Sequence, residues 1–213
     1  MAYDLYVVTD EGLGNGLSHT EIARLSILGG ADAVQLRDKN MPCREMVRVA
    51  SEIADIAKEN GALFFVNDRL DVALASGANG VHLGQDDLPL EYARAIVPGD
   101  FLIGVSVGNV KEAVLAEDGG ADYIALSPTF NTGSKDDAGP GHGLLELSKI
   151  SSRVSIPILG IGGIGVHNAA DVISAGANGV AVISAVVSQQ DIPSAAYEMK
   201  EAIRSAKDSR AGF

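Results

Sequence analysis

Residues 77–83 read GANGVHL, and closely similar phrases occur three more times along the chain. These are GADAVQL at 30–36, GADYIAL at 120–126 and GANGVAV at 176–182. All four begin with Gly-Ala-Asp/Asn and continue into a short apolar run, which is typical of a turn that enters a buried strand. We call this pattern the GAD/GAN motif. Its spacing is too irregular for a solenoid of fixed period.

Each GAD/GAN motif follows a stretch whose apolar residues recur at helical spacing. Before the first copy, Ser18 and Glu21 have the spacing of a capping box and predict the start of a helix. The glycine that opens each copy suits the left-handed conformation that commonly ends a helix. Each motif therefore predicts a junction from a helix to a strand.

Four further apolar runs lie between the motifs and predict strands of their own. They cover residues 5–10, 63–68, 101–107 and 156–163. Continuous apolar strands that alternate with helices favour a parallel sheet covered by helices. We therefore predict an α/β fold, a single (β/α)8 TIM barrel that forms one catalytic domain over residues 1–213. An open doubly wound sheet is the alternative, although an early Gly-x-Gly-x-x-Gly turn is missing.

The composition narrows the class of partner. The net charge is −12, and no basic stripe is present, so we expect no nucleic acid partner. No apolar run reaches the roughly 18 residues that cross a bilayer, so we expect no membrane partner. The single Cys43 and the absence of a signal peptide pattern lead us to expect a cytoplasmic protein. Small phosphorylated molecules remain suitable partners, and a homo-oligomer stays open.

In such barrels the active site lies at the carboxyl ends of the strands. After the second predicted strand come Gln35, Arg37 and Lys39, which share one side if the chain continues in an extended path. Two cations and an amide that point together suit an anion with several oxygens. The competing interpretation is a solvated loop whose charges are balanced by Asp38.

Acidic residues follow the next two predicted strands. Asp68 follows one strand, and Asp86 and Asp87 follow its neighbour. Converging carboxylates repel each other unless a cation lies between them, and Mg²⁺ takes carboxylate and phosphate oxygens. There are two alternatives. The aspartates could form a general acid/base pair, or Asp86 or Asp87 could cap the following helix. Spacing alone does not choose between Asp86 and Asp87.

A second group of candidates follows the sixth to eighth predicted strands, where such barrels often hold a phosphate on backbone amides. These residues are Thr132, Gly133, Ser134, Lys135, Gly163, Ile183 and Ser184. Asn67 and Ser106 end the third and fifth strands. His82 takes the place of Gln35 in its own motif, which predicts a satisfied histidine facing the barrel interior. His19, His142 and His167 carry no comparable signal.

The ordered motifs of this chain resemble those of the thiamine phosphate synthase family. The segments that carry the resemblance are VTD, QLRDK, VNDRLDVALASGANGVHLGQDD, GVSV, SPTFNTGSK, GIGGI and GVAVISA, between Leu5 and about Val186. The resemblance implies a transferase that joins 4-amino-2-methyl-5-hydroxymethylpyrimidine diphosphate to 4-methyl-5-(2-phosphoethyl)thiazole. Thiamine phosphate and pyrophosphate would be the products, and Mg²⁺ would be the cofactor. The loop reads TGSK where the family commonly has TxTK, a change that keeps a hydroxyl.

The resemblance also implies roles for individual residues. The pyrimidine diphosphate would be bound by Gln35, Arg37, Lys39, Asn67, Ser106 and Lys135, of which Arg37, Lys39 and Lys135 would act on the departing pyrophosphate. The metal would be held by Asp68 and Asp87. The thiazole phosphate would be bound by Thr132, Gly133, Ser134, Gly163, Ile183 and Ser184.

Three other functions fit the same architecture. A related thiazole tautomerase would lack the full set of diphosphate and metal residues. A phosphosugar isomerase would need an acid–base pair and a single phosphate site. A sensor would bind phosphorylated ligands without turnover.

Overall fold

The computed structural model describes residues 3–133 and 140–211. Within them, eight parallel strands close into a barrel in which each strand pairs with the next and β1 pairs with β8. The strands are β1 (Leu5–Val8), β2 (Ala33–Leu36), β3 (Leu63–Asn67), β4 (Gly80–Leu83), β5 (Leu102–Val107), β6 (Tyr123–Leu126), β7 (Ile158–Ile161) and β8 (Gly179–Val182). The predicted (β/α)8 barrel is confirmed, and closure excludes the open sheet.

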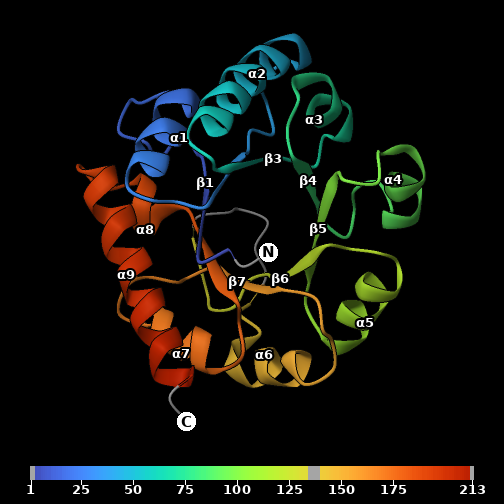
Figure 1. The fold of residues 1–213 in the computed structure, drawn as a ribbon, viewed down its shortest axis with the longest axis vertical. Coiled ribbons are helices and arrows are strands. Elements are labelled where there is room, and N and C mark those ends of the chain that lie inside the picture. Colours follow the sequence, from blue (N-terminus) through green and yellow to red (C-terminus); the bar gives the residue numbers. More distant parts are fainter. Residues whose placement is uncertain (1–2, 134–139, 212–213) are drawn as a thin grey trace.

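Helices surround the barrel and connect its strands (Figure 1). They are α1 (His19–Leu28), α2 (Cys43–Glu59), α3 (Leu70–Ser76), α4 (Leu90–Ile96), α5 (Val110–Asp118), α6 (Gly143–Ser151), α7 (Ala169–Ser174), α8 (Ser184–Val187) and α9 (Ile192–Ala211). The capping box predicted at α1 is confirmed, because Ser18 Oγ accepts from the Glu21 N–H and the Glu21 carboxylate accepts from the Ser18 N–H.

Some elements end elsewhere than predicted, and the backbone gives the reason. β3 stops at Asn67 because Asp68 has a left-handed backbone, with φ of 62°. β7 stops before Gly162 and Gly163, whose φ values are 95° and 64°. The short helix α8 was not anticipated, since a four-residue helix gives no periodic signal in the sequence.

The GAD/GAN motifs have one shared conformation. Their first residues, Gly30, Gly77, Gly120 and Gly176, have φ values of 96°, 76°, 84° and 114°. Such values are costly for any residue with a Cβ atom, which explains why glycine opens every copy. The prediction that each motif joins a helix to a strand is confirmed.

The Asp or Asn of each motif ties two strands together. The side-chain oxygens of Asp32, Asn79, Asp122 and Asn178 accept from the backbone N–H groups of Leu5, Phe64, Ile103 and Ile158, at 3.0, 2.8, 2.7 and 2.8 Å respectively. Each Asp or Asn immediately precedes an even-numbered strand, and each donor is the first or second residue of the odd-numbered strand before it. We call these contacts the four strand ties. They explain why the motif marks every second strand.

Aromatic rings fill part of the barrel interior. Tyr3, Tyr6, Phe65 and Tyr123 pack with ring centroids 5.4–6.4 Å apart. Gly104 in β5 makes room for one of them, since an added Cβ atom would lie 2.0 Å from Cζ of Tyr123. A glycine inside a strand usually marks such a close approach. The core is therefore packed rather than hollow.

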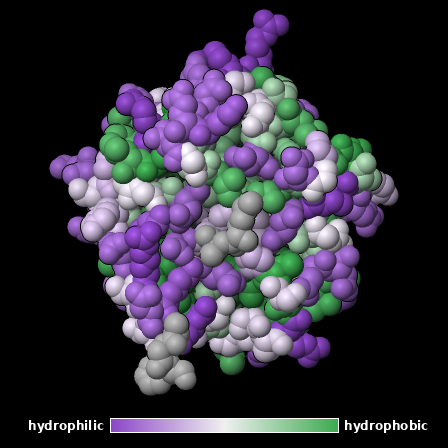
Figure 2. All heavy atoms as spheres, in the orientation of Figure 1, coloured by the Kyte–Doolittle hydropathy of each residue, from purple (hydrophilic) through white to green (hydrophobic). Residues whose placement is uncertain are grey.

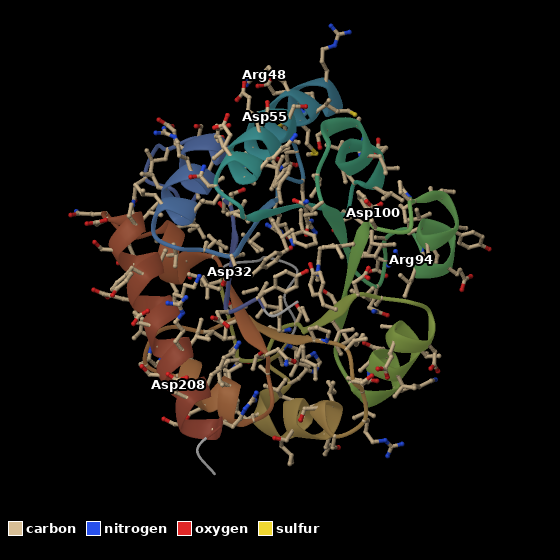
Figure 3. The ribbon with its side chains drawn as sticks, viewed as in Figure 1. Asp32, Arg48, Asp55, Arg94, Asp100 and Asp208 are labelled. Carbon is tan, nitrogen blue, oxygen red and sulfur yellow. The ribbon has the colours of Figure 1, made fainter. Side chains whose placement is uncertain are left out.

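The outer surface is largely polar. Arg48 and Asp55 lie on the outside of α2 (Figure 3), and Arg48 pairs with Glu45 and Glu52. Figure 2 shows hydrophilic residues over much of one face, with smaller hydrophobic areas between them. Among the helices of residues 3–133 and 140–211, none combines the length and hydropathy required to cross a bilayer.

Candidate active site

A cavity of about 250 Å³ opens where the strands have their carboxyl ends. Ten of the residues predicted for the site line it. They are Arg37, Lys39, Asn67, Asp68, Asp87, Ser106, Thr132, Gly163, Ile183 and Ser184. The cavity thus brings together residues from the ends of seven strands.

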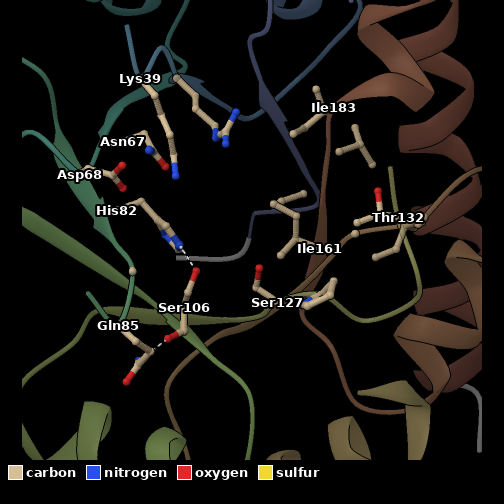
Figure 4. Close-up of a pocket in the computed structure, with 18 of the residues that line it drawn as sticks. Lys39, Asn67, Asp68, His82, Gln85, Ser106, Ser127, Thr132, Ile161 and Ile183 are labelled. Atoms are coloured by element: carbon tan, nitrogen blue, oxygen red, sulfur yellow. Dashed lines mark hydrogen bonds between the residues drawn. The ribbon is translucent and has the colours of Figure 1, made fainter. Parts of the chain in front are cut away.

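Lining members of the two predicted groups face each other across this cavity. Figure 4 shows Lys39, Asn67 and Asp68 on one side, with Thr132 and Ile183 on the opposite side. The first side carries the cations and carboxylates, and the second side carries a hydroxyl, apolar groups and glycine backbone. A ligand with two differently charged ends would therefore find a different environment at each end.

The cationic side depends on the conformation of the loop after β2. Arg37 and Lys39 both line the cavity, as the alternation of an extended chain predicts. The intervening Asp38 has one carboxylate oxygen, Oδ1, on the backbone N–H groups of Asn40 and Met41, at 2.7 and 2.8 Å. Asp38 therefore closes a turn in its own loop.

The other oxygen of Asp38 meets a histidine that sequence reasoning missed. His19 is 1% exposed; its Nε2 lies 3.4 Å from Asp38 Oδ2, and its Nδ1 lies 2.7 Å from the Thr9 hydroxyl. Burial raises the pKa of Asp38, but hydrogen bonds from backbone N–H groups and His19 outweigh it and leave that pKa below its usual value. The only signal in the sequence was a polar residue at the first turn of α1.

The carboxylates of Asp68 and Asp87 lie together, as their places after adjacent strands predict. Burial, followed by the neighbouring Asp87 carboxylate, raises the pKa of Asp68 from 3.8 to about 6, while Lys39 and Arg37 oppose the rise. Asp68 also has the left-handed backbone noted above, a conformation that concentrates at functional sites. The fold therefore holds two like charges in contact at some cost.

Helix capping does not explain these aspartates. The N-cap of α4 is Pro89, and it makes no side-chain capping bond, so the capping alternative for Asp86 and Asp87 is wrong. Asp87 Oδ2 instead accepts from the Gly84 N–H at 2.7 Å, which fixes the carboxylate within the turn after β4. Asp86 is exposed at the cavity edge.

A buried chain of hydrogen bonds leads from the barrel core to the cavity. Gln35 Nε2 donates to the Tyr6 hydroxyl at 2.8 Å, and the Tyr6 and Tyr123 hydroxyls lie 3.0 Å apart. Tyr123 then contacts His82 Nδ1 at 3.0 Å, and His82 Nε2 contacts Ser106 Oγ at 2.9 Å. Burial raises the pKa of both tyrosines, so their hydroxyls stay protonated. As predicted, His82 is a satisfied interior histidine.

Four predicted residues are not placed at the cavity wall. Gln35 is 3% exposed and lies below the cavity in the chain just described, and Gly133 is not among the lining residues. Ser134 and Lys135 lie outside the described residues. Conversely, Gln85 lines the cavity and donates to the Ser106 carbonyl at 2.6 Å (Figure 4), a contact that the sequence did not indicate.

The donor set on the cationic side suits Mg²⁺ bound together with a phosphate-bearing ligand. Among the described residues, no cluster of three or more His, Cys, Asp or Glu side chains forms a metal site on its own. Mg²⁺, however, commonly takes one or two carboxylates and completes its shell with water and phosphate oxygens. The paired carboxylates of Asp68 and Asp87, beside two cations, fit that pattern.

The sequence of this chain matches one family of known proteins. A family model described as thiamine monophosphate synthase matches residues 5–186. A thiamine-phosphate synthase from Methanoculleus marisnigri is 60% identical over 207 residues, which cover 97% of this chain and 98% of that protein. Another from Methanocella arvoryzae is 56% identical, with 95% of this chain and 96% of that protein covered.

A solved structure agrees in fold. Thiamine phosphate pyrophosphorylase from Pyrococcus furiosus superposes with a TM-score of 0.89 at 42% sequence identity, and 96% of each chain is covered. The family model and these relatives together cover all eight strands of the barrel. The chain belongs to the thiamine monophosphate synthase family.

Proposed function

We propose that this chain joins a hydroxymethylpyrimidine diphosphate to a thiazole phosphate, forming thiamine phosphate and pyrophosphate. The observation that carries the proposal is the two-sided cavity: paired carboxylates and cations face a second side with a hydroxyl, apolar groups and glycine backbone. A diphosphate and a monophosphate need these two environments. The relatives named above, which cover nearly the whole chain, support the same reaction.

The pyrimidine diphosphate would bind on the cationic side. Arg37 can hold two phosphate oxygens in one plane, and Lys39 adds a point charge beside them. Asn67 and Ser106 also line the cavity and offer an amide and a hydroxyl. Gln35 would act through the buried hydrogen-bond chain that ends at Ser106.

Asp68 and Asp87 would hold Mg²⁺ with the oxygens of the diphosphate. Their contact, and the raised pKa of Asp68, are what a cation between them would relieve. Bound there, the ion would stabilise the negative charge of the departing pyrophosphate. The carboxylates keep the metal at the diphosphate end, away from the thiazole phosphate.

The thiazole phosphate would bind on the opposite side. Gly163 and Ser184 line it at the ends of β7 and β8, the place where such barrels often hold a phosphate. Thr132 adds a hydroxyl, and Ile183 gives the ring an apolar surface. Gly133 and Ser134 belong to the same proposed set by their place in the loop after β6, whereas Lys135 of that loop would bind the pyrimidine diphosphate.

In this proposal the protein mainly positions the two substrates. Arg37 and Lys39 stabilise the leaving pyrophosphate, with Lys135 in the same role. The aminopyrimidine shares positive charge at its methylene carbon once the carbon–oxygen bond breaks, and the thiazole nitrogen attacks that carbon. The apolar wall near Ile183 excludes water, which would otherwise capture the cation.

One assay tests the proposal against its alternatives. Purified protein is given the two substrates separately and together, with and without Mg²⁺. Pyrophosphate, thiamine phosphate, isomerised thiazole phosphate and ligand binding are measured. Product that requires both substrates and Mg²⁺ supports the synthase. Isomerised thiazole phosphate alone would indicate a tautomerase, and tight binding without product would indicate a sensor.

A further inference from the structure

A line of hydrogen bonds leads to the loop after β2, which carries Arg37 and Lys39, and lies outside the cavity. It runs from the Thr9 hydroxyl to His19 Nδ1 and from His19 Nε2 to the carboxylate of Asp38. Thr9 and His19 are 0% and 1% exposed, so neither reaches solvent. None of the three residues lines the cavity. Asp38 connects this line to the site through the backbone that joins it to Arg37 and Lys39.

Local structure fixes His19 in this place. The capping box starts α1 at His19, and the Glu11 carboxylate accepts from the His19 N–H at 2.9 Å. Side chains in a helix point back toward its amino end, which here lies beside the carboxyl ends of β1 and β2. The ring is therefore directed at the loop that follows β2.

The donor and acceptor roles follow from chemistry. The Asp38 carboxylate can only accept, so the proton must lie on His19 Nε2. In the neutral ring, Nδ1 is then an acceptor, and the Thr9 hydroxyl donates to it. Thr9 is itself fixed, because its N–H donates to the Gln35 carbonyl at 2.9 Å. Both ends of the line are thus attached to the strands that present the loop.

Asp38 sits between two cations in the sequence and is the residue best placed to neutralise them. With Oδ1 on two backbone N–H groups and Oδ2 on His19, both of its oxygens are engaged within the loop and α1. Successive side chains of an extended segment point to opposite sides. Anchoring Asp38 toward His19 therefore directs Arg37 and Lys39 to the cavity side.

We propose that Thr9, His19 and Asp38 form a positioning line that holds Arg37 and Lys39 toward the cavity for binding of a diphosphate. The inference rests on the proposed function for the identity of the substrate. Binding of an anion by the two cations is independent of that identity. His19 acts through Asp38 and touches neither substrate.

The main test replaces His19 with residues that separate shape from hydrogen bonding. His19→Phe keeps a buried ring but leaves Thr9 and Asp38 without their partner, whereas His19→Gln keeps an amide N–H near the position of Nε2. For His19→Phe we expect the KM for the pyrimidine diphosphate to rise about tenfold, with the KM for the thiazole phosphate unchanged. His19→Gln should recover most of that loss.

Two further variants keep the test decisive. Ser26→Ala alters another buried polar residue of α1 that has no link to the loop, and both KM values should stay at the wild-type level. Thr9→Val keeps the side-chain volume and removes only the hydroxyl, so it serves if His19→Phe does not fold. It should raise the KM for the diphosphate in the same direction by a smaller factor.

Binding of Mg²⁺-pyrophosphate, measured by calorimetry, separates this inference from the proposed function. Weaker binding in His19→Phe or Thr9→Val supports the positioning line even if the wild type makes no thiamine phosphate. Folded variants that bind Mg²⁺-pyrophosphate as tightly as wild type would overturn it. So would a parallel rise of both KM values, or a His19→Gln variant as impaired as His19→Phe.

Discussion

Asp68 combines three features that are unfavourable for the stability of the fold. Its backbone is left-handed, its carboxyl is half-buried, and a second carboxylate lies against it. The raised pKa means that the ionised form is disfavoured in the folded state. Ionisation as the pH rises from about 4 through about 6 therefore lowers the stability of the metal-free protein.

Asp68→Asn should consequently stabilise the metal-free protein while it inactivates the enzyme. At pH 8 without Mg²⁺ we expect a gain of about 1 kcal/mol after allowance for solvent screening, or about 2–4 °C in melting temperature. At pH 4 the gain should disappear. Activity should fall by about 100-fold or more. Thermal melts and steady-state kinetics measure both effects.

Asp55→Asn is the matched control, because it removes the same charge from an exposed position on α2. It should change neither the melting temperature at pH 8 nor the activity. If Asp68→Asn retained wild-type activity with normal Mg²⁺ dependence, Asp68 would not be a metal ligand.

The site could be predicted from the sequence where a short local rule applies. Alternation along an extended chain placed Arg37 and Lys39 on one side, and adjacency of strands brought Asp68 to Asp87. His19 escaped, because its partners are 10 and 19 positions away in the sequence and the contact depends on how α1 packs on the barrel. A contact of that kind produces no periodic pattern in the sequence.

At the scale of the elements, the four strand ties explain why the third position of the GAD/GAN motif is Asp or Asn. The sequence predicted the junctions from glycine and from the apolar runs, but it did not show what the Asp or Asn does. That role depends on register, since each side chain reaches an N–H at the start of one particular neighbouring strand, the first or second of that strand. The motif is thus a device for pairing strands.

Asn79→Ala should destabilise the barrel, because it leaves the N–H of Phe64 without its acceptor. We expect a loss of about 1–3 kcal/mol in the free energy of unfolding, measured with urea. Asn79→Asp keeps the acceptor, as Asp32 and Asp122 show in their own ties, and should cost much less. Equal losses in the two variants would contradict the role of the tie. The KM and kcat values should stay unchanged in both.

Gly104→Ala should also destabilise the barrel, for a steric reason. Its Cβ atom would overlap the ring of Tyr123, and such overpacking typically costs about 1–3 kcal/mol. Gly99→Ala is the control, since an added Cβ atom there meets nothing within 4 Å. In a double-mutant cycle, Tyr123→Leu should remove most of the cost of Gly104→Ala. Additive losses would show that the ring is not the obstacle.

At the scale of the molecule, an acidic protein with a net charge of −12 concentrates a few cations at one cavity. Carboxylates there repel pyrophosphate, and the cations of the loop repel Mg²⁺. Bound Mg²⁺ would offset the carboxylates that repel pyrophosphate, and bound pyrophosphate would offset the cations that repel Mg²⁺. Binding of the two should therefore be cooperative.

Mg²⁺ and pyrophosphate together should raise the melting temperature by more than the sum of their separate effects. At about 100 times the dissociation constant, a ligand adds about 2.7 kcal/mol to the unfolding free energy. Differential scanning fluorimetry with each ligand alone and with both gives the comparison. Asp68→Asn should abolish the excess, and strictly additive shifts in the wild type would contradict a shared site.

The strand ties also bear on the ancestry of the barrel. They divide it into four quarters of equivalent construction, each with two strands joined by one Asp or Asn. Four equivalent quarters are the pattern left by successive duplication of one ancestral unit. Because every tie lies inside a quarter, a circular permutant opened at a border between quarters, near Gly61 or Gly99, keeps all four intact within continuous chain.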